Sequence, residues 1–441
     1  MFYTSAKMSK IKENDILTVT CQELSYEGLG VFRIDNYPII IKDFFPGEVA
    51  KIKVTKKFAK YAKANVIELI KRSNDRNDLD IKQTDSMPLV NLQYQKQIDY
   101  KDQYLINLFK RNLLFDNLQN FVPSDHIFNY RNKAKYPLTV LNNKLVIGTF
   151  IKDSNDITDE VSNDLLNNHL INKALDQILN IINQHFETIS KQSNLNLFKE
   201  ITLRVNQENK MQVLVNLHSD FDLPKKLQEK LFQIDYIINL SVIKNNKVIE
   251  LFKKEDFYLS LLDKRFIVNS QSFFQVNNNV AAKLFSKLKE LNHDSKKTLL
   301  DIFCGVGVIS NLIANKNQKV MGIDIVKEAI LDANNNAILN DLSNYDYYAN
   351  DVFKSVNIIS KYTDDSLTIF DPPRSGLNSD IIDFISQNNM NNIAYISCNP
   401  RTLIRDLKDF TKHGYKIKYV QGFDMFPNTN HIEVLTILAK K

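Results

Sequence analysis

The stretch KTLLDIFCGVGVIS, from Lys297 to Ser310, decides the fold of this chain. Its first half is an apolar run with the length of a buried strand, and Gly305 and Gly307 follow directly. Glycines just past a strand allow a cofactor to approach the backbone closely. The third glycine of the dinucleotide fingerprint is replaced by Ser310, which disfavours a nicotinamide cofactor.

The sequence after this stretch alternates between strand and helix patterns. The expected strands are QKVMGID, SLTIFD, NIAYISC, YKIKYVQGFD and EVLTILAK, and helical patterns separate most of them. This alternation begins near Gln275 and predicts an α/β fold with a parallel, doubly wound sheet. In such sheets ligands bind outside the carboxyl ends of the strands.

The second expected strand ends on an acidic residue, Asp324. Its offset from Gly305 is the usual separation of about 20 residues between a glycine turn and a ribose-binding acid. The glycine–acid pair therefore indicates a nucleoside cofactor. An ordinary tight turn followed by a surface aspartate would give the same pattern.

A third strand ends in the motif DPPRSGL, from Asp371 to Leu377. The prolines make the exit from a central strand rigid, at the edge where open sheets bind ligands. Methyltransferases that act on exocyclic amines often have an aromatic residue after the two prolines. Arg374 takes that place here, which weakens an amino-methyltransferase interpretation.

The next strand leads to Cys398 and the residues NPRTL. Asn399 is a good helix N-cap and Pro400 suits the first turn, so a helix should begin directly after the thiol. The positive end of that helix, with Arg401, would favour the thiolate form. A buried cysteine that ends a core strand is the alternative. We prefer a nucleophile because the DPPRSGL motif ends a neighbouring strand.

The carboxyl-terminal motif DMFPNTNHIE offers a base to accompany this nucleophile. Thiolate addition to carbon 6 of uracil would make carbon 5 nucleophilic toward a sulfonium methyl donor, and a separate base must then remove the carbon 5 proton. Glu433 begins the last expected strand and is the first candidate. His431 is the competing one.

The amino-terminal region has a different pattern, with short alternating strands and turns at Gly28, Gly30 and Pro46-Gly47. It predicts a small β-barrel. Basic residues crowd one strand–turn–strand, with Phe58 and Tyr61 between them, which is a surface suited to single-stranded RNA. A solvated lysine-rich face is the alternative. The basic residues are Lys51, Lys53, Lys56, Lys57, Lys60 and Lys63.

Length and composition set the remaining bounds. The 441 residues predict two or three domains, and a net charge of +6 is compatible with nucleic acid without being diagnostic of it. The chain contains no run apolar enough to span a bilayer, and the start MFYTSAKMSK lacks a signal-peptide core. We expect a cytoplasmic protein that does not bind membranes. Cys21, Cys304 and Cys398 lie too far apart in sequence to indicate a metal pair.

Together these motifs resemble the tRNA/rRNA uracil-5-methyltransferase family. YEGLGV and FFPGEVAKIKV resemble a TRAM domain, an OB-like RNA-binding module, and YRNKAKYP resembles the opening of the family's central domain. SQSFFQVNNNVA, DIFCGVG, DPPRSGL, SCNPRTLIRDL and DMFPNTNHIE complete the match. The resemblance implies a Rossmann-like class I methyltransferase domain, an OB-like TRAM barrel and a central α+β domain. The implied boundaries are 8–71 for the TRAM domain, 118–265 for the central domain, and 266–441 with the helical segment 90–117 for the methyltransferase domain.

The resemblance also implies the roles of individual residues. S-adenosylmethionine is the implied methyl donor, and RNA, most often 23S ribosomal RNA in members with a TRAM domain, is the implied substrate. tRNA is the alternative substrate, and we expect a monomer. Cys398 is the implied nucleophile and Glu433 the proton acceptor. The implied cofactor-site residues are Gln275, Phe303, Asp324 and Asp371.

Two departures from the family pattern matter. Many members hold an iron–sulfur cluster with cysteines placed before the helical segment, whereas the corresponding region here, DIKQTDSMPLVNLQYQKQ, contains none. Because a cluster needs thiolate ligands, we expect no cluster and no metal. Asn428 replaces a common histidine, so any proton relay through that histidine is absent.

Two other functions remain as alternatives. An RNA cytosine-5 methyltransferase uses the same thiolate chemistry, but carries its cysteine on the Pro-Cys strand motif, where this chain has Arg374. A non-catalytic RNA-binding factor would have no physical reason to keep Cys398, Glu433 and Gln275 together.

Overall fold

The computed structural model describes residues 11–79, 81–150, 157–158, 163–189, 197–218, 222–292, 296–363, 365–388 and 390–440. The first residues of the predicted TRAM domain and the segment expected to lack a signal peptide lie outside these ranges. The chain forms two compact units. Unit 1 comprises residues 1–124, 398–404 and 421–434, and unit 2 comprises residues 125–397, 405–420 and 435–441.

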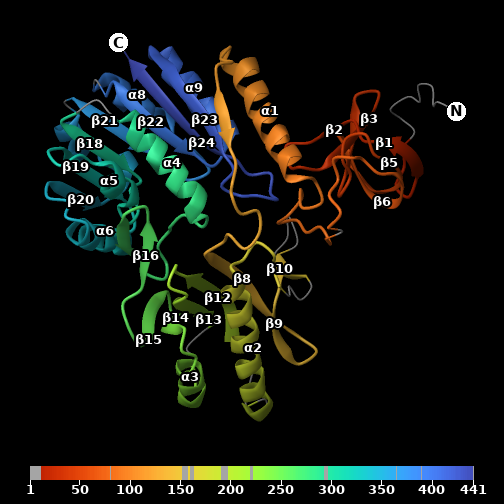
Figure 1. The fold of residues 1–441 in the computed structure, drawn as a ribbon, viewed down its shortest axis with the longest axis horizontal. Coiled ribbons are helices and arrows are strands. Elements are labelled where there is room, and N and C mark those ends of the chain that lie inside the picture. The colour runs from red at the N-terminus through yellow and green to blue at the C-terminus, as the bar shows by residue number, and fades with distance from the viewer. Residues whose placement is uncertain are drawn as a thin grey trace. The chain divides into compact units, whose positions relative to one another are not determined.

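Unit 1 begins with a six-stranded sheet in the order β1-β5-β6-β4-β3-β2 (Figure 1). Its longest hairpin alternates strictly: Ala50, Ile52 and Val54 of β5 are buried, while Lys51 and Lys53 face solvent. This alternation confirms the strand pattern expected from the sequence. The strands are β1 (Ile16–Thr20), β2 (Glu23–Leu24), β3 (Gly30–Ile34), β4 (Tyr37–Ile41), β5 (Val49–Lys57) and β6 (Ala62–Lys71).

The remainder of unit 1 is built on helix α1 (Tyr94–Leu113) and strand β7 (Gln119–Val122). The helix was expected over almost the same residues. Its buried face follows the helical period and includes two polar members, Gln97 and Lys101. Gly422 lies against this region, and a Cβ there would come within 2.4 Å of the Phe121 ring, so the close approach requires glycine.

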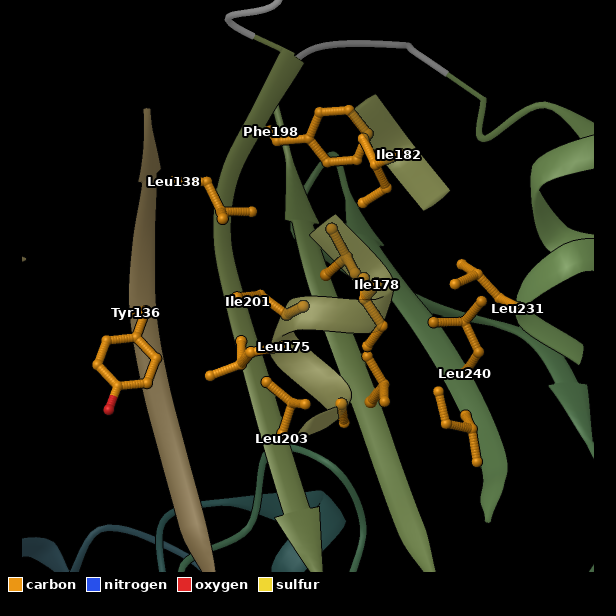
Figure 2. Close-up of a cluster of buried hydrophobic side chains, with 14 of the residues drawn as sticks. Tyr136, Leu138, Leu175, Ile178, Ile182, Phe198, Ile201, Leu203, Leu231 and Leu240 are labelled. Carbon is orange, nitrogen blue, oxygen red and sulfur yellow. The ribbon is translucent and has the colours of Figure 1, made fainter. Parts of the chain in front are cut away.

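Unit 2 contains a six-stranded sheet in the order β15-β14-β13-β12-β8-β9. Helix α2 covers one face of it, and Figure 2 shows Leu175, Ile178 and Ile182 among the apolar side chains of this core, which include Ile201 and Leu203. The elements are β8 (Lys133–Leu141), β9 (Lys144–Ile147), β12 (Phe198–Val205), β13 (Met211–Leu217), β14 (Ile237–Lys244), β15 (Lys247–Lys253), α2 (His169–Ile189) and α3 (Lys225–Phe232). Two small hairpins, β10 (Thr149–Phe150) with β11 (Ile157–Thr158) and β16 (Tyr258–Leu261) with β17 (Lys264–Ile267), complete this part.

The second sheet of unit 2 follows the order β20-β19-β18-β21-β22-β24-β23. Strand β18 is central and pairs in parallel with β19 and β21, and the outer pairs β19–β20 and β21–β22 are parallel too. The strands are β18 (Thr298–Ile302), β19 (Lys319–Asp324), β20 (Tyr345–Ala349), β21 (Ser366–Phe370), β22 (Asn392–Ser397), β23 (Tyr415–Phe423) and β24 (Glu433–Lys440). The predicted doubly wound sheet is confirmed.

Helices connect these strands, and the parallel pairing brings the carboxyl ends of β18 to β22 to one edge of the sheet. The helices are α4 (Asn278–Leu291), α5 (Val308–Ile313), α6 (Lys327–Leu339), α7 (Val356–Ile359), α8 (Ser379–Gln387) and α9 (Pro400–Lys412) (Figure 1). Helix α9 and strands β23 and β24 contribute residues to both units, and β23 pairs with β7 at its unit 1 end. Among the described helices, none is long and apolar enough to cross a membrane.

Candidate active site

The loop after β18 is shaped by three residues in the left-handed region. Phe303, Gly305 and Gly307 have φ angles of 67°, 52° and 75°. The backbone N–H groups of Phe303 and Cys304 both donate to the carbonyl of Ile323, at 2.9 and 3.1 Å, which ties the loop to β19. A Cβ at Gly305 would meet no atom within 4 Å, so open space lies beside the loop.

Asp324 lies directly against this loop. One carboxylate oxygen accepts the N–H of Gly305 at 3.0 Å, and the other accepts the N–H of Val326 at 3.0 Å. The two hydrogen bonds fix the carboxylate at the edge of the sheet. The predicted glycine–acid pair is therefore assembled in space as well as in sequence.

Sequence reasoning missed the neighbouring strand β20 and the residues after it. Asp351 follows β20 and accepts the N–H of Phe353 at 3.0 Å, which caps a short 3₁₀ turn over Val352–Lys354. The ring of Phe353 is 44% exposed and its centroid lies 6.1 Å from that of Phe303. These two rings form an apolar surface beside the open loop. The available signal was the tyrosine-rich segment YDYYA, followed by an acid.

Two carboxyl groups belong to the central strands β18 and β21 or directly follow them. Asp301 is fully buried on β18 and accepts the N–H of Ser310 at 3.1 Å, while its other oxygen has no hydrogen-bond partner among the described residues. Burial raises the pKa of Asp301 to about 6. Asp371, just after β21, keeps some exposure, but desolvation of its carboxyl and the charge of Asp301 raise its pKa to about 7. Neighbouring cationic charge would restore the ionised forms.

Gln275 lies on the segment that precedes α4. It is 7% exposed, and its backbone carbonyl accepts a hydrogen bond from the Asn132 side-chain amide at 2.9 Å. Helix α4 packs against α5, the helix that follows the glycine loop. The structure thus gathers Phe303, Asp324 and Asp371 at one edge of the sheet, and a hydrogen bond ties Gln275, on the segment before α4, to Asn132.

Cys398 directly follows β22 and is partly exposed. Helix α9 begins at Pro400, and the Asn399 side chain accepts the N–H of Arg401 at 3.2 Å. The Asn399 carbonyl accepts the N–H of Leu403 at 3.1 Å, the first bond of the helix. The expected helix start after the thiol is confirmed.

Glu433 begins β24 and is 3% exposed. Strand β24 lies beside β22, and at its far end the N–H of Lys440 donates to the carbonyl of Asn391 at 2.8 Å. Asn391 immediately precedes β22, so the two strands run in opposite directions. Glu433 at the start of β24 and Cys398 just after β22 therefore lie at the same end of this strand pair.

The loop that leads to Glu433 is held by α1 within unit 1. Asp424 forms an ion pair with Lys101 at 2.6 Å, and neither side chain is accessible to solvent. Burial lowers the pKa of Lys101, and the Asp424 carboxylate opposes that shift. The Tyr94 hydroxyl donates to Asp424 at 2.8 Å, and the Lys101 ammonium also donates to the Phe426 carbonyl at 3.1 Å.

Asn428, which replaces the common histidine, has a structural place in this loop. Its φ is 65°, a conformation that asparagine tolerates well. Its side-chain oxygen accepts from the Gln97 amide, and its N–H donates to the Gln97 side-chain oxygen, both at 2.9 Å. Sequence reasoning missed Gln97 and Lys101, although polar residues four positions apart on an apolar helix face were a visible signal. His431 packs edge-on against Phe426, with centroids 5.9 Å apart.

The lysine-rich hairpin of unit 1 has an ordered tip. The rings of Phe58 and Tyr61 stack with centroids 4.6 Å apart, and the ammonium groups of Lys56 and Lys63 lie 5.3 and 5.8 Å from the centre of the Phe58 ring. The Tyr37 hydroxyl bonds the carbonyls of Phe58 and Tyr61 at 2.7 and 2.6 Å. The interleaved cations and rings are thus presented on a fixed turn.

The segment after this hairpin is fastened by polar contacts. Arg76 pairs with Glu48 at 2.7 Å and with Asp43 at 2.9 Å, and its guanidinium lies 4.6 Å from the Phe45 ring centre. The Asn91 amide donates to Asp43 at 3.2 Å. In the part of the chain that the structure describes, no group of three or more His, Cys, Asp or Glu side chains is arranged to hold a metal ion.

Comparison with known proteins gives a consistent assignment. The family model for tRNA (uracil-5-)-methyltransferase matches residues 93–441, and the TRAM domain model matches residues 10–67. An "uncharacterized RNA methyltransferase" of Enterococcus faecalis is 29% identical over 98% of both chains, and one from Fusobacterium nucleatum is 28% identical over 98% of this chain and 97% of its own. The crystal structure of the Pyrococcus abyssi tRNA (uracil-54, C5)-methyltransferase in complex with S-adenosyl-L-homocysteine has a TM-score of 0.73. It is 23% identical and covers 96% of this chain and 100% of its own.

The family match spans most of the chain and includes the glycine loop, Asp371, Cys398 and Glu433. The chain therefore belongs to the tRNA (uracil-5-)-methyltransferase family and is an RNA (uracil-5-)-methyltransferase that carries a TRAM domain.

Proposed function

We propose that this protein methylates carbon 5 of a uridine in 23S ribosomal RNA through a covalent bond between Cys398 and the base. One observation carries the mechanism. A partly exposed thiol precedes helix α9, and the strand that begins with a buried carboxylate, Glu433, lies beside the strand that ends at that thiol. Nucleophile and base are the two groups that the reaction at carbon 5 requires.

The proposed methyl donor is S-adenosylmethionine, which supplies an electrophilic methyl group on a sulfonium ion. The edge of β18 and β19 fits its nucleoside. The position of a Gly305 Cβ is open space, and the carboxylate of Asp324 is fixed beside it for ribose hydroxyls. Phe303 and Phe353 offer apolar ring surface, and the carboxyls of Asp301 and Asp371, whose pKa values are raised, would be ionised more readily beside a cation. We assign Gln275 to the same site on the family resemblance.

Cys398 begins the proposed chemistry as a thiolate, favoured by the positive end of α9. Its sulfur bonds to carbon 6 of the uracil, and the electron pair of the 5,6 double bond moves toward the carbonyl oxygen at carbon 4. The resulting enolate makes carbon 5 the nucleophile, which would accept the methyl group as the bond from the methyl carbon to the sulfonium sulfur breaks, and the donor would leave as the neutral thioether S-adenosylhomocysteine. Glu433 then takes the proton from carbon 5, the double bond reforms, and the sulfur leaves as thiolate. The enzyme is returned once Glu433 loses that proton to solvent.

The lysine-rich hairpin supports RNA as the surface partner of unit 1. Cations at its tip would neutralise phosphates, and the Phe58–Tyr61 pair offers rings to unstacked bases. We propose ribosomal RNA because members of the resembled family that carry a TRAM domain act most often on it. tRNA is the second candidate, favoured by the full-length likeness to a Pyrococcus abyssi enzyme whose substrate is tRNA. We further propose that the enzyme is a monomer without an iron–sulfur cluster.

The decisive experiment supplies the protein with donor labelled on its methyl group and with separate unmodified transcripts of 23S ribosomal RNA, 16S ribosomal RNA and tRNA. We expect label in 5-methyluridine, at one or a few sites, in the 23S transcript. Label in tRNA alone would replace the ribosomal proposal by the second candidate. Label in 5-methylcytidine would overturn the uridine assignment. Stoichiometric iron and sulfide in anaerobically purified protein would contradict the absence of a cluster.

A further inference from the structure

Three side chains from distant parts of the sequence meet in unit 1 close to Cys398. The guanidinium of Arg401 lies over the ring of Tyr26, 3.8 Å from the ring centre. The Arg401 Nε donates to the hydroxyl of Tyr104 at 3.3 Å, and the rings of Tyr26 and Tyr104 are 5.1 Å apart at an interplanar angle of 39°. We call Tyr26, Tyr104 and Arg401 the arginine–tyrosine platform.

The backbone beneath this platform is fixed by two further hydrogen bonds. The Tyr100 hydroxyl of α1 donates to the carbonyl of Ser25 at 2.6 Å, and the Asn430 amide donates to the carbonyl of Tyr26 at 3.2 Å. Asn430 belongs to the loop that leads to Glu433. The Tyr26 turn is therefore fastened to α1 and to that loop, and little side-chain or backbone freedom remains to be lost when a ligand binds.

The platform is accessible and lies near the nucleophile. Arg401 is exposed, and Tyr26 and Tyr104 are partly exposed. Arg401 is on the first turn of α9, three residues after Cys398, so the two Cα atoms are at most about 10 Å apart. That reach is comparable to the step between neighbouring nucleotides of a single strand. A base bonded to Cys398 must be drawn out of any stack, which leaves its neighbours in need of new stacking partners.

We propose that the arginine–tyrosine platform stacks the base of a nucleotide adjacent to the target uridine. A guanidinium plane supported by a tyrosine ring is a surface that unstacked RNA bases use, and it tolerates different bases because each has a π face. This inference rests on the proposed function, because it assumes that RNA is held at Cys398. It adds a positioning role for one turn of the TRAM domain next to the nucleophile.

The test uses a 20-nucleotide RNA centred on the uridine mapped with the transcripts above. Abasic nucleotides are placed singly at the two positions on either side of that uridine. Equilibrium affinities are measured for wild type, Arg401→Ala, Arg401→Lys, Tyr26→Ala and Tyr26→Phe. Arg111→Ala, which removes an exposed arginine near the end of α1, is the matched control.

We expect Arg401→Ala and Tyr26→Ala to weaken binding of intact RNA by about ten-fold to a hundred-fold, the range measured for a base–aromatic stack. Tyr26→Phe should bind nearly normally and Arg401→Lys poorly, because an ammonium lacks the planar surface. Wild type should lose the same factor when one particular neighbouring base is removed. Arg401→Ala should then lose little more on that abasic RNA.

Three results would overturn the inference. The first is a wild-type affinity unchanged by every abasic substitution. The second is a loss of RNA affinity in Arg401→Ala that is as large on every abasic RNA as on intact RNA, together with a salt slope that is lower by about one. That behaviour marks a phosphate contact. The third is a wild type that neither methylates nor binds any of the RNAs, in which case the proposed function fails too. Alkylation of Cys398 by iodoacetamide without RNA shows whether Arg401→Ala acts instead through the thiol.

Discussion

Cys304 and Cys398 occupy similar places in sequence, since each lies at the carboxyl end of a parallel strand before a helix. The structure gives them opposite surroundings. Cys304 is buried, and its sulfur lies 3.0 Å from where a Gly322 Cβ would be. Burial, with the charges of Asp301 and Asp324, raises its pKa well above the ordinary thiol value. Cys398 is partly exposed and precedes the amino end of α9.

This difference shows that a cysteine at a strand end is not a nucleophile by position alone. The thiolate needs water or positive charge nearby, and Cys304 has apolar packing and two carboxylates instead. Its side chain fills space beside Gly322 of β19. Variants of the two cysteines therefore test the proposed nucleophile in unit 1 separately from the proposed donor site in unit 2.

The largest effect is expected when Cys398 is replaced. Cys398→Ala should show no methyl transfer, because no thiolate remains to activate carbon 5, while donor binding in unit 2 stays nearly intact. Wild type should form a denaturant-stable adduct with RNA that carries 5-fluorouridine, since fluorine does not leave as a proton. An assay of methyl transfer measures the first of these expectations, and calorimetry of donor binding measures the second.

Cys304→Ala is the matched control for that experiment. It should keep methyl transfer and adduct formation, with some loss of thermal stability because a buried side chain is truncated. An adduct that persists in Cys398→Ala and disappears in Cys304→Ala would reverse the assignment of the two cysteines.

The next largest effect is expected at Glu433, the proposed base. Glu433→Gln keeps the shape of the side chain and removes its basicity, so methyl transfer should stop after one turnover with RNA still bonded to Cys398. Turnover should fall by about a hundred-fold to ten-thousand-fold, the usual contribution of a general base. Gel electrophoresis under denaturing conditions detects the methylated adduct.

Glu328→Gln, an exposed change on α6, is the control for charge loss and should turn over normally. Normal turnover of Glu433→Gln, or loss of transfer without any adduct, would remove Glu433 as the base. His431→Gln would then be the variant to measure.

A moderate effect is expected at the lysine-rich hairpin. Replacement of Lys56, Lys57 and Lys60 by Gln should weaken RNA binding and lower its salt slope by roughly one unit for each phosphate that is no longer neutralised. Donor affinity should not change, because the proposed donor-binding residues belong to unit 2. Titrations of RNA binding at several salt concentrations measure the slope. An unchanged slope would mean that these lysines face solvent and do not contact RNA phosphates.

The sequence predicted the doubly wound sheet because its glycine loop and apolar strands have strong local signals. It also predicted the helix start at Pro400, since an N-cap and a proline are local chemistry. Strand β20 was missed because YDYYA is short, polar and only partly buried at a sheet edge. Asp351 and Phe353 were missed with it, because residues can be placed at the ligand-binding edge of a sheet only when the strand before them is recognised.

Residues whose role depends on long-range contacts were not predictable. In the sequence Lys101 is one cation on an amphipathic helix. Its ion pair with Asp424 could not be predicted, because 323 positions separate the two residues. The meeting of Tyr26 with Arg401 depends on the tertiary fold in the same way. The roles assigned to Cys398, Glu433, Gln275, Phe303, Asp324 and Asp371 stay predictions.

The smallest expected effect concerns Asp371, the carboxyl just after β21, whose pKa is raised by burial and by the charge of Asp301. In the fold the pKa of Asp371 is raised to about 7, so between about pH 4 and pH 7 the native state binds more protons than the unfolded chain. The contribution of this carboxyl to the free energy of unfolding of wild type therefore falls as pH rises through that window. Asp371→Asn has no such carboxyl, so its advantage in melting temperature over wild type should be larger at pH 8 than at pH 5. Each unit of pKa shift is worth about 1.4 kcal/mol, which limits the gain in the free energy of unfolding to ~4 kcal/mol.

Asp263→Asn, in an exposed turn, is the control and should show no pH-dependent difference in melting temperature from wild type. Equal differences for Asp371→Asn at both pH values, measured by calorimetry without donor, would show that its carboxyl is not held in the protonated form.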